Sequence, residues 1–372
     1  MKNDVLIPKI DLVINKLMNL GGADYENDKK QSVEEILKLG NVSRDFGIEE
    51  WDWPQGVGLY GIYKLQEYYG DDRYMEFFIE WFERNLDIGL PSKNINTTAP
   101  YLALASILDK MPEKEKYEKL CLDHADWLVN ELPKTKEAGF QHVTTAIGDR
   151  NGIMLNDSEL WLDTIFMTAL FLYKMAIRYD NQKWKEVAEY QLMIHIKYLY
   201  DKESGLFYHG WSFNRNDNFG GIFWCRGNSW FTLGAIEFLA INKNISSGVK
   251  DFILHTFKAQ VDALKELQHE SGLWTTVLDD HQSYVEASGT AAIVAGILQA
   301  IKKGYIDSSY KECAEKAISG LLNCVDEDGT VLKVSAGTAM GMDADHYKGI
   351  QIKPMAYGQS LTLIALVEAL EK

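Results

Sequence analysis

Apolar residues recur along most of the chain at spacings of three and four, which is the period of a helix buried on one face. This pattern predicts about twelve helices. Evidence for strands is limited to short stretches such as 205–209 and 330–334, which could form hairpins. All seven prolines fall at or near the expected helix ends, where proline is tolerated. The expected helices span residues 4–20, 55–69, 72–88, 97–109, 114–132, 157–179, 181–200, 227–241, 249–268, 285–303, 308–322 and 355–370.

The expected helices are of two kinds. Those at 114–132 and 181–200 have outer faces rich in Lys and Glu, whereas 157–179 is apolar nearly all round and must be covered on most sides. The two kinds alternate in pairs, which indicates an inner and an outer ring. We therefore expect an all-α fold, an (α/α)6 barrel of six helical hairpins. A solenoid of helical repeats is the alternative, and the absence of a repeat signature favours the barrel. No linker divides the chain, so a single domain over 1–372 is expected.

Charge and cysteine content exclude several classes of function. The chain has 54 acidic and 38 basic residues, a net charge of −16, and no cluster of Lys and Arg. We therefore expect no nucleic-acid partner and no polybasic membrane contact. The first twenty residues lack the uninterrupted apolar core of a signal peptide or a membrane span. The four cysteines lack CxxC spacing, which fits a reducing compartment, so a cytoplasmic location is expected.

Aromatic residues make up 12% of the chain, including ten tryptophans. Such residues can fill a large core or line a sugar-binding cleft, and their positions must decide. Many fall in segments just before or at the start of alternate helices. In a barrel of hairpins these helix starts meet at one pole, where free N–H groups also suit an anion. We expect six such segments to converge there: 49–56, 94–100, 156–163, 223–230, 279–290 and 349–360.

Asp163 is the most informative of these residues. It lies about two turns inside the most apolar expected helix, on the same face as Glu159. Burial would raise its pKa and favour the protonated form, as a general acid requires. The alternative is a structural aspartate that pairs with an arginine or caps a neighbouring helix.

A second group of candidates is Trp224, Arg226 and Trp230. The planar guanidinium of Arg226 suits a carboxylate, and the tryptophans could stack on sugars or simply fill the core. His142 and His209 each follow a Gly-aromatic stretch in a loop, where a histidine can bind a ligand or simply be a polar residue at the surface. His195 and His255 lie on helices and are expected to be structural. No His/Asp/Glu cluster has metal-ligand spacing, and no phosphate or dinucleotide motif is present, so neither a metal nor a cofactor is expected.

Several motifs resemble one family in order along nearly the whole chain. The chain resembles glycoside hydrolase family 105, the unsaturated rhamnogalacturonyl hydrolases, and is more distantly similar to family 88, the unsaturated glucuronyl hydrolases. The resemblance implies an (α/α)6 barrel without a metal. It also implies removal of a 4,5-unsaturated uronic acid from the non-reducing end of oligosaccharides made by polysaccharide lyases, with rhamnose as the expected neighbouring sugar. The motifs are WDWPQGVGLYGI, NINTTAP, ELWLDTIFM, GLFYHGW, WCRGNSW, ASGTAAIVAGI and AYGQSLTLIAL.

The implied reaction does not attack the anomeric carbon. An acid protonates C4 of the enol ether, water adds at C5, and the resulting hemiketal opens, so the spacing rule for two carboxylates does not apply. The resemblance makes Asp163 the general acid/base. It implies that the remaining candidates bind the anionic oligosaccharide substrate: Trp53, Asn96, His142, His209, Trp224, Arg226 and Trp230.

Asn96 marks a departure from the family pattern. Family 88 enzymes usually have an acidic residue at the position where this chain reads NINTTAP. An asparagine can bind a hydroxyl but cannot exchange protons, so the chemistry is expected to rest on Asp163 alone. Two alternatives stay open: an epimerase or isomerase, and a non-catalytic carbohydrate-binding protein on the same barrel. A buried Asp163 argues against the binding protein, and the lack of an obvious histidine cluster argues against the epimerase.

Overall fold

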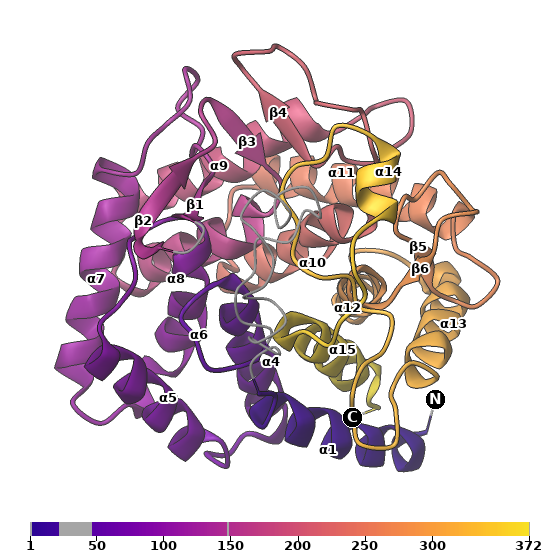
Figure 1. Ribbon diagram of the computed structural model, residues 1–372, viewed down its shortest axis with the longest axis horizontal. Helices are drawn as coiled ribbons and strands as arrows, with labels where there is room; N and C mark the ends of the chain where they lie inside the picture. Colours follow the sequence, from indigo (N-terminus) through magenta and orange to yellow (C-terminus); the bar gives the residue numbers. More distant parts are fainter. Residues whose placement is uncertain (1, 22–46, 147–148, 372) are drawn as a thin grey trace.

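The computed structural model describes residues 2–21, 47–146 and 149–371, and it is an (α/α)6 barrel (Figure 1). Each inner helix packs on the next, and α15 packs on α4, so the inner ring closes. The closed ring confirms the barrel and excludes the solenoid. The inner helices are α4 (Trp53–Tyr69), α6 (Ala99–Ile107), α8 (Leu170–Arg178), α10 (Cys225–Ile241), α12 (Ala287–Lys302) and α15 (Ala356–Ala369). The outer helices are α1 (Asn3–Met18), α5 (Met75–Ile88), α7 (Lys114–Asn130), α9 (Gln182–Leu199), α11 (Ser247–Glu266) and α13 (Lys311–Leu322).

The inner helices pack closely because they combine apolar side chains with very small ones. Nearly every residue of α12 is buried, and its sequence alternates Ile, Val and Leu with Gly and Ala. A β-carbon at Gly296 would lie 2.4 Å from the carbonyl oxygen of Thr232, so only glycine allows α12 to approach α10 this closely. The resulting hydrophobic core is one cluster in space, and its buried residues come from all along the described chain, from Leu6 to Leu370. In the described ranges, no helix is long and apolar enough to cross a membrane.

Short strands and turns surround the pole where the inner helices begin. The hairpin of β1 (Val143–Ala146) and β2 (Asp149–Leu155) pairs Val143 with Leu155. Strand β3 (Glu159–Trp161) pairs antiparallel with β4 (Gly210–Ser212), and β5 (Trp274–Thr275) with β6 (Val285–Glu286). Single helical turns are η1 (Asn96–Thr98), η2 (Leu108–Lys110) and η4 (Ser308–Tyr310), and α14 (Ala344–Lys348) is a short helix. The stretches 205–209 and 330–334 form only isolated bridges.

The start of the predicted helix 157–179 is wrong. Residues Glu159–Trp161 form a strand, and the helix begins after Asp163 with a π-helical turn, η3 (Ile165–Ala169). The carbonyl oxygen of Asp163 accepts hydrogen bonds from the backbone N–H groups of Phe166 and Met167. Asp163 therefore stands at the entrance of the helix rather than two turns inside it, and Glu159 does not share its helix face. The other expected helices are present, with ends shifted by a few residues.

Candidate active site

A cavity opens at the pole where the inner helices begin. It has a volume of about 440 Å³, counting the space at its mouth. Four of the segments expected to converge supply its wall, and Glu286 and Tyr357 of the other two lie behind Arg226. The lining residues are Trp53, Asn96, His142, Thr144, Met154, Trp161, Asp163, Trp224, Arg226, Thr338 and Ala339.

Asp163 is the only carboxylate among these lining side chains. Its Oδ2 lies 3.2 Å from Nε2 of His209. Both atoms are buried, and among the described residues neither has a hydrogen-bond partner of good geometry, so the two side chains make a close polar contact. Burial raises the pKa of Asp163, but the interactions with His209 and His142 outweigh burial and hold it below its usual value. The expectation of a raised pKa is therefore wrong for the free site.

Histidines from three separate segments surround Asp163, although no histidine cluster is obvious in the sequence. The ring of His142 stacks on Trp161, with centroids 4.0 Å apart and planes 8° apart. Burial lowers the pKa of His142 to about 3 and that of His195 to about 4, so both are neutral near pH 7. Both rings interact electrostatically with Asp163. The cluster was hidden in the sequence because its members come from the β1 segment, from α9 and from the loop before β4.

The Nδ1 atoms of His209 and His195 have different kinds of partner, a side-chain hydroxyl for His209 and a backbone carbonyl for His195. Nδ1 of His209 lies 2.8 Å from the hydroxyl of Tyr347, and its ring centroid lies 4.5 Å from that of Trp224. Nδ1 of His195 donates to the carbonyl oxygen of Gln191 at 2.7 Å, as an interior helix histidine can. This hydrogen bond agrees with the interpretation of His195 as a structural residue. The charge of the His195 ring nevertheless influences Asp163.

Arg226 is buried, and it holds the far wall of the cavity. Its Nη1 donates to the carbonyl oxygen of Ser335 at 2.8 Å, and its Nη2 to that of Ala336 at 2.7 Å. The guanidinium also lies over the rings of Trp224 and Tyr357, at 4.5 and 4.8 Å. Arg226 therefore fixes the segment that leads into Thr338 and Ala339, besides lining the cavity itself.

The remaining predicted residues differ in their access to the cavity. Trp53 lines it and stacks on Tyr357, with centroids 4.5 Å apart, and Asn96 lines it from η1. Trp230 is fully buried and is absent from the lining. Its ring packs edge-on against Trp53, with centroids 6.2 Å apart, and lies tilted against Phe166, with centroids 5.2 Å apart. Trp230 thus supports the cavity floor rather than a sugar platform.

Comparison with known proteins agrees with this arrangement. Residues 31–372 match Glycosyl Hydrolase Family 88. A crystal structure described as a possible member of GH105 family from Salmonella enterica serovar Paratyphi A is 35% identical, with a TM-score of 0.87, over 99% of this chain and 94% of that one. The chain belongs to the family 88/105 glycoside hydrolases. It is an enzyme of this group, which excludes a purely carbohydrate-binding protein.

Two further proteins are similar to this chain over nearly its whole length. The Unsaturated rhamnogalacturonyl hydrolase YesR of Bacillus subtilis strain 168 is 29% identical over 348 residues, which cover 93% of this chain and 96% of YesR. The unsaturated glucuronyl hydrolase of Bacillus sp. GL1 is 19% identical, with a TM-score of 0.70, over 98% of this chain and 96% of that one. At that identity the likeness shows a shared fold.

Some residues that line the cavity were not among the residues predicted from the sequence. Trp161 lies in the ELWLD motif, and it was overlooked because the motif was interpreted as a helix. Its indole N–H donates to Glu159 at 2.8 Å, which fixes the ring under His142. Thr144 and Met154 come from the hairpin, and Thr338 and Ala339 from the loop before α15. Loops without a helical period gave no signal for these residues.

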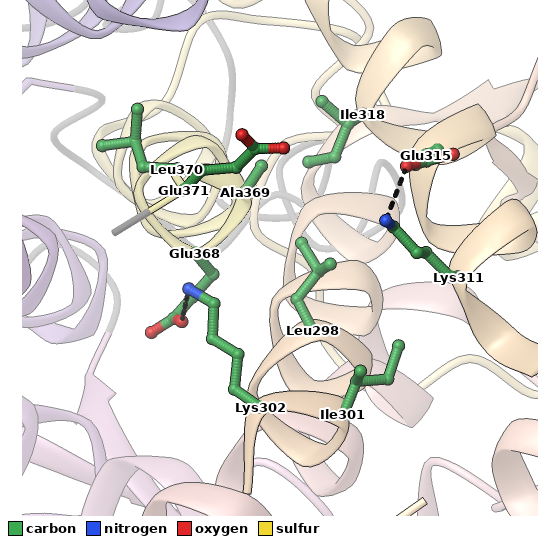
Figure 2. A pocket seen from close by; sticks show the side chains of 10 residues that line it. All are labelled: Leu298, Ile301, Lys302, Lys311, Glu315, Ile318, Glu368, Ala369, Leu370 and Glu371. Atoms are coloured by element: carbon green, nitrogen blue, oxygen red, sulfur yellow. Dashed lines mark hydrogen bonds and ion pairs between the residues drawn. The ribbon is translucent and has the colours of Figure 1, made fainter. Parts of the chain in front are cut away.

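A larger groove lies away from the site, between α12, α13 and the end of α15 (Figure 2). Its volume is about 1330 Å³, including open space. Figure 2 shows Leu298, Ile301 and Ile318 on its apolar wall. Lysines lie beside two of its carboxylates: Lys302 is 3.0 Å from Glu368, and Lys311 is 3.7 Å from Glu315. None of the candidate residues predicted from the sequence lines this groove, so the smaller cavity is the candidate site.

Proposed function

We propose that this enzyme removes a 4,5-unsaturated uronic acid from the non-reducing end of oligosaccharides left by a polysaccharide lyase. The substrate we propose is the unsaturated rhamnogalacturonan disaccharide, because YesR carries that activity in its name and aligns over nearly the whole chain. The observation that carries the proposal is Asp163, the single carboxylate among the described residues that line the cavity. Ordinary glycosidases need two carboxylates, one on each side of the scissile bond.

One carboxylate is sufficient for hydration of an enol ether. Asp163 delivers its proton to C4, and the positive charge that develops at C5 is stabilised by the ring oxygen. Water then forms a bond to C5 and gives its proton back to the ionised Asp163. The hemiketal so formed opens and releases the neighbouring sugar. The carboxyl group acts first as an acid and then as a base, and it ends the cycle as it began.

Because the pKa of Asp163 is low in the free site, substrate binding must raise it before the carboxyl group can hold the proton that it donates. A uronate is negatively charged, and a second negative charge close by raises the pKa of a carboxyl group. Substrate entry also removes water from the cavity, which strengthens this repulsion. We therefore expect Asp163 to take up a proton from solvent when the uronate binds.

Sugar contacts follow from the remaining lining residues. Trp53, Trp161 and Trp224 offer flat faces and indole edges, and Asn96 offers an amide that can meet hydroxyl groups. The indole N–H of Trp224 is buried and, within the described ranges, has no partner, so a substrate oxygen can accept from it.

Loss of ultraviolet absorbance tests the activity, because the unsaturated uronate carries a double bond conjugated to its carboxylate. Incubation with lyase-digested rhamnogalacturonan should abolish that absorbance. Asp163→Asn keeps the shape and removes the proton, so kcat should fall about 100-fold or more with the fold intact. Asp123→Asn is the matched control, since Asp123 is exposed on α7 beside Lys119.

Heavy water separates this mechanism from displacement at the anomeric carbon. Hydrolysis in D₂O should place one deuterium at C4 of the released keto sugar. Product without deuterium at C4, or efficient cleavage of the saturated uronide, would refute the mechanism. Retained absorbance on every unsaturated substrate would refute the activity and return the isomerase alternative.

A further inference from the structure

A short helix brings a tyrosine against His209. Helix α14 lies between α13 and α15, and Asp343 caps it by accepting from the N–H of His346 at 2.9 Å. Tyr347 on this helix is buried, and its hydroxyl lies 2.8 Å from Nδ1 of His209. The same segment supplies Thr338 and Ala339 to the cavity wall. The tyrosine thus links the loop that shapes the cavity to the histidine that faces Asp163.

The hydrogen bonds of the tyrosine determine where its proton points. The backbone N–H of Gly341 donates to the hydroxyl oxygen at 3.1 Å, so the oxygen already acts as an acceptor there. The hydroxyl proton can then go to Nδ1 of His209 or to the sulfur of Met340, 3.7 Å away. A thioether is a weak acceptor, so Nδ1 takes the hydrogen bond. A neutral imidazole that accepts at Nδ1 carries its proton on Nε2.

We propose that Tyr347 is a positioning residue that fixes the Nε2–H tautomer of His209 and directs this proton at Asp163. Nε2 is the atom 3.2 Å from Oδ2 of the carboxylate. An N–H in that position stabilises the ionised carboxylate, whereas the other tautomer would present a lone pair and favour a protonated carboxyl. The hydroxyl of Tyr347 therefore influences the charge of Asp163 through one hydrogen bond to His209 and one close contact from His209 to the carboxylate.

Other titratable groups also face this chain of contacts. His142 and His195 interact with Asp163 from the β1 segment and from α9, and His346 on α14 interacts with His209. Both His142 and His195 have pKa values far below 7, so they do not titrate near neutral pH. The tautomer assignment stands without the proposed function, and its catalytic consequence rests on the proposed role of Asp163.

Nitrogen NMR of the histidine rings tests the tautomer directly. In the wild-type protein labelled with ¹⁵N-histidine, Nδ1 of His209 should be unprotonated and Nε2 protonated at neutral pH. In Tyr347→Phe, a substantial fraction of Nδ1 should become protonated. Unchanged ring nitrogens in this variant would overturn the proposal, whatever the substrate of the enzyme proves to be.

The pH profile of kcat/KM tests the catalytic consequence. The limb that Asp163 controls should move upward by about one pH unit in Tyr347→Phe, a tenfold change in the ionisation of the carboxyl group. Tyr284→Phe is the matched control, because the Tyr284 hydroxyl donates to the carbonyl oxygen of Tyr347 at 3.2 Å but no contact joins it to His209. The control should leave the limb unmoved, and an equal shift in both variants would overturn the proposal.

A third variant keeps the test informative if Tyr347→Phe fails to fold. Replacement of Tyr347 by 3-fluorotyrosine retains the shape of the ring and makes the hydroxyl a stronger donor. The stronger donor should hold the Nε2–H tautomer more firmly and move the limb to lower pH. A shift to higher pH would overturn the proposal. Loss of activity towards unsaturated substrates in the wild type would instead count against the proposed function, since the NMR result is independent of it.

Discussion

Arg226→Lys separates the positive charge of Arg226 from its planar, two-nitrogen geometry. In the structure one terminal nitrogen serves the carbonyl oxygen of Ser335 and the other that of Ala336. Both bonds hold the segment that continues to Thr338 in the cavity wall. A lysine ends in a single nitrogen, so it can keep the charge but cannot occupy both positions of the fork.

The expected cost follows from the groups left without partners. A buried carbonyl that loses its donor costs about 1–3 kcal/mol. Loss of the guanidinium from between the Trp224 and Tyr357 rings costs about 1–2 kcal/mol more, because the site is desolvated. We expect the free energy of unfolding to fall by about 2–4 kcal/mol. We also expect kcat/KM to fall about 5- to 150-fold, because the wall shifts and the planar donors are lost. This fall corresponds to a loss of about 1–3 kcal/mol in transition-state stabilisation.

Urea denaturation and steady-state kinetics on the unsaturated disaccharide measure the two effects. Arg178→Lys is the matched control, since Arg178 makes a two-pronged pair with Asp109 near the surface. Exposed pairs contribute at most about 1 kcal/mol, so that variant should stay close to the wild type in both assays. Wild-type stability and kinetics in Arg226→Lys would refute the argument and remove Arg226 from both the cavity wall and the substrate contacts.

Two further perturbations test the environment of the site. His142 and His195 have folded pKa values of about 3 and about 4, below the unfolded value, so their contribution to stability is complete above about pH 6.5 and is lost as the pH falls. When the pH falls from 7 to 5, each of these histidines should lower the free energy of unfolding by about 2 kcal/mol. The urea midpoint of His195→Gln should therefore fall less steeply over this range than that of the wild type, and an equally steep fall would contradict the argument. Gly210→Ala would place a β-carbon 2.9 Å from the carbonyl oxygen of Leu160 and 2.3 Å from the side chain of Met340. The free energy of unfolding should therefore fall by about 1–3 kcal/mol, and kcat/KM should fall as well. Gly248→Ala, where the β-carbon meets nothing within 4 Å, should have the stability of the wild type to within about 1 kcal/mol, and equal behaviour of the two variants would disprove the steric argument.

Local sequence pattern was sufficient for the ring of helices but not for the start of α8. Helices such as α12 and α15 are apolar on every side, and that property is visible in the sequence itself. The apolar residues of ELWLDTIFM fit a helix equally well. They form a strand instead because β3 pairs with β4, and the N–H of Leu162 donates to the carbonyl oxygen of His209. A partner some fifty residues away in the sequence is outside the range of a periodicity argument.

The residues of the candidate site could be predicted where they lie at helix starts, but their electrostatics could not. The barrel geometry places helix starts together, so Trp53, Asn96, Trp224 and Arg226 could be expected at one pole, and they line one cavity. The charge of Asp163 could not be predicted, because it depends on a histidine brought within 3.2 Å by strand pairing. Tyr347 was also missed, since helix α14 has only five residues and is too short to show a helical period. Burial was the only effect that the sequence revealed, and it acts on the pKa in the opposite direction to the histidines.

Closure of the inner ring has a consequence for synthesis of the protein. The hydroxyl of Ser360 on α15 donates to the carbonyl oxygen of Val57 on α4, a contact between residues 303 positions apart. On the ribosome, α4 emerges long before α15, and the apolar flanks of α4 and α12 that α15 covers stay uncovered until residues 356–369 have left the exit tunnel. Contacts of such high order slow folding and leave a nascent chain open to aggregation. We therefore expect the yield of folded enzyme to depend on chaperones that hold the unfinished ring, more than on the intrinsic stability of any one helical hairpin.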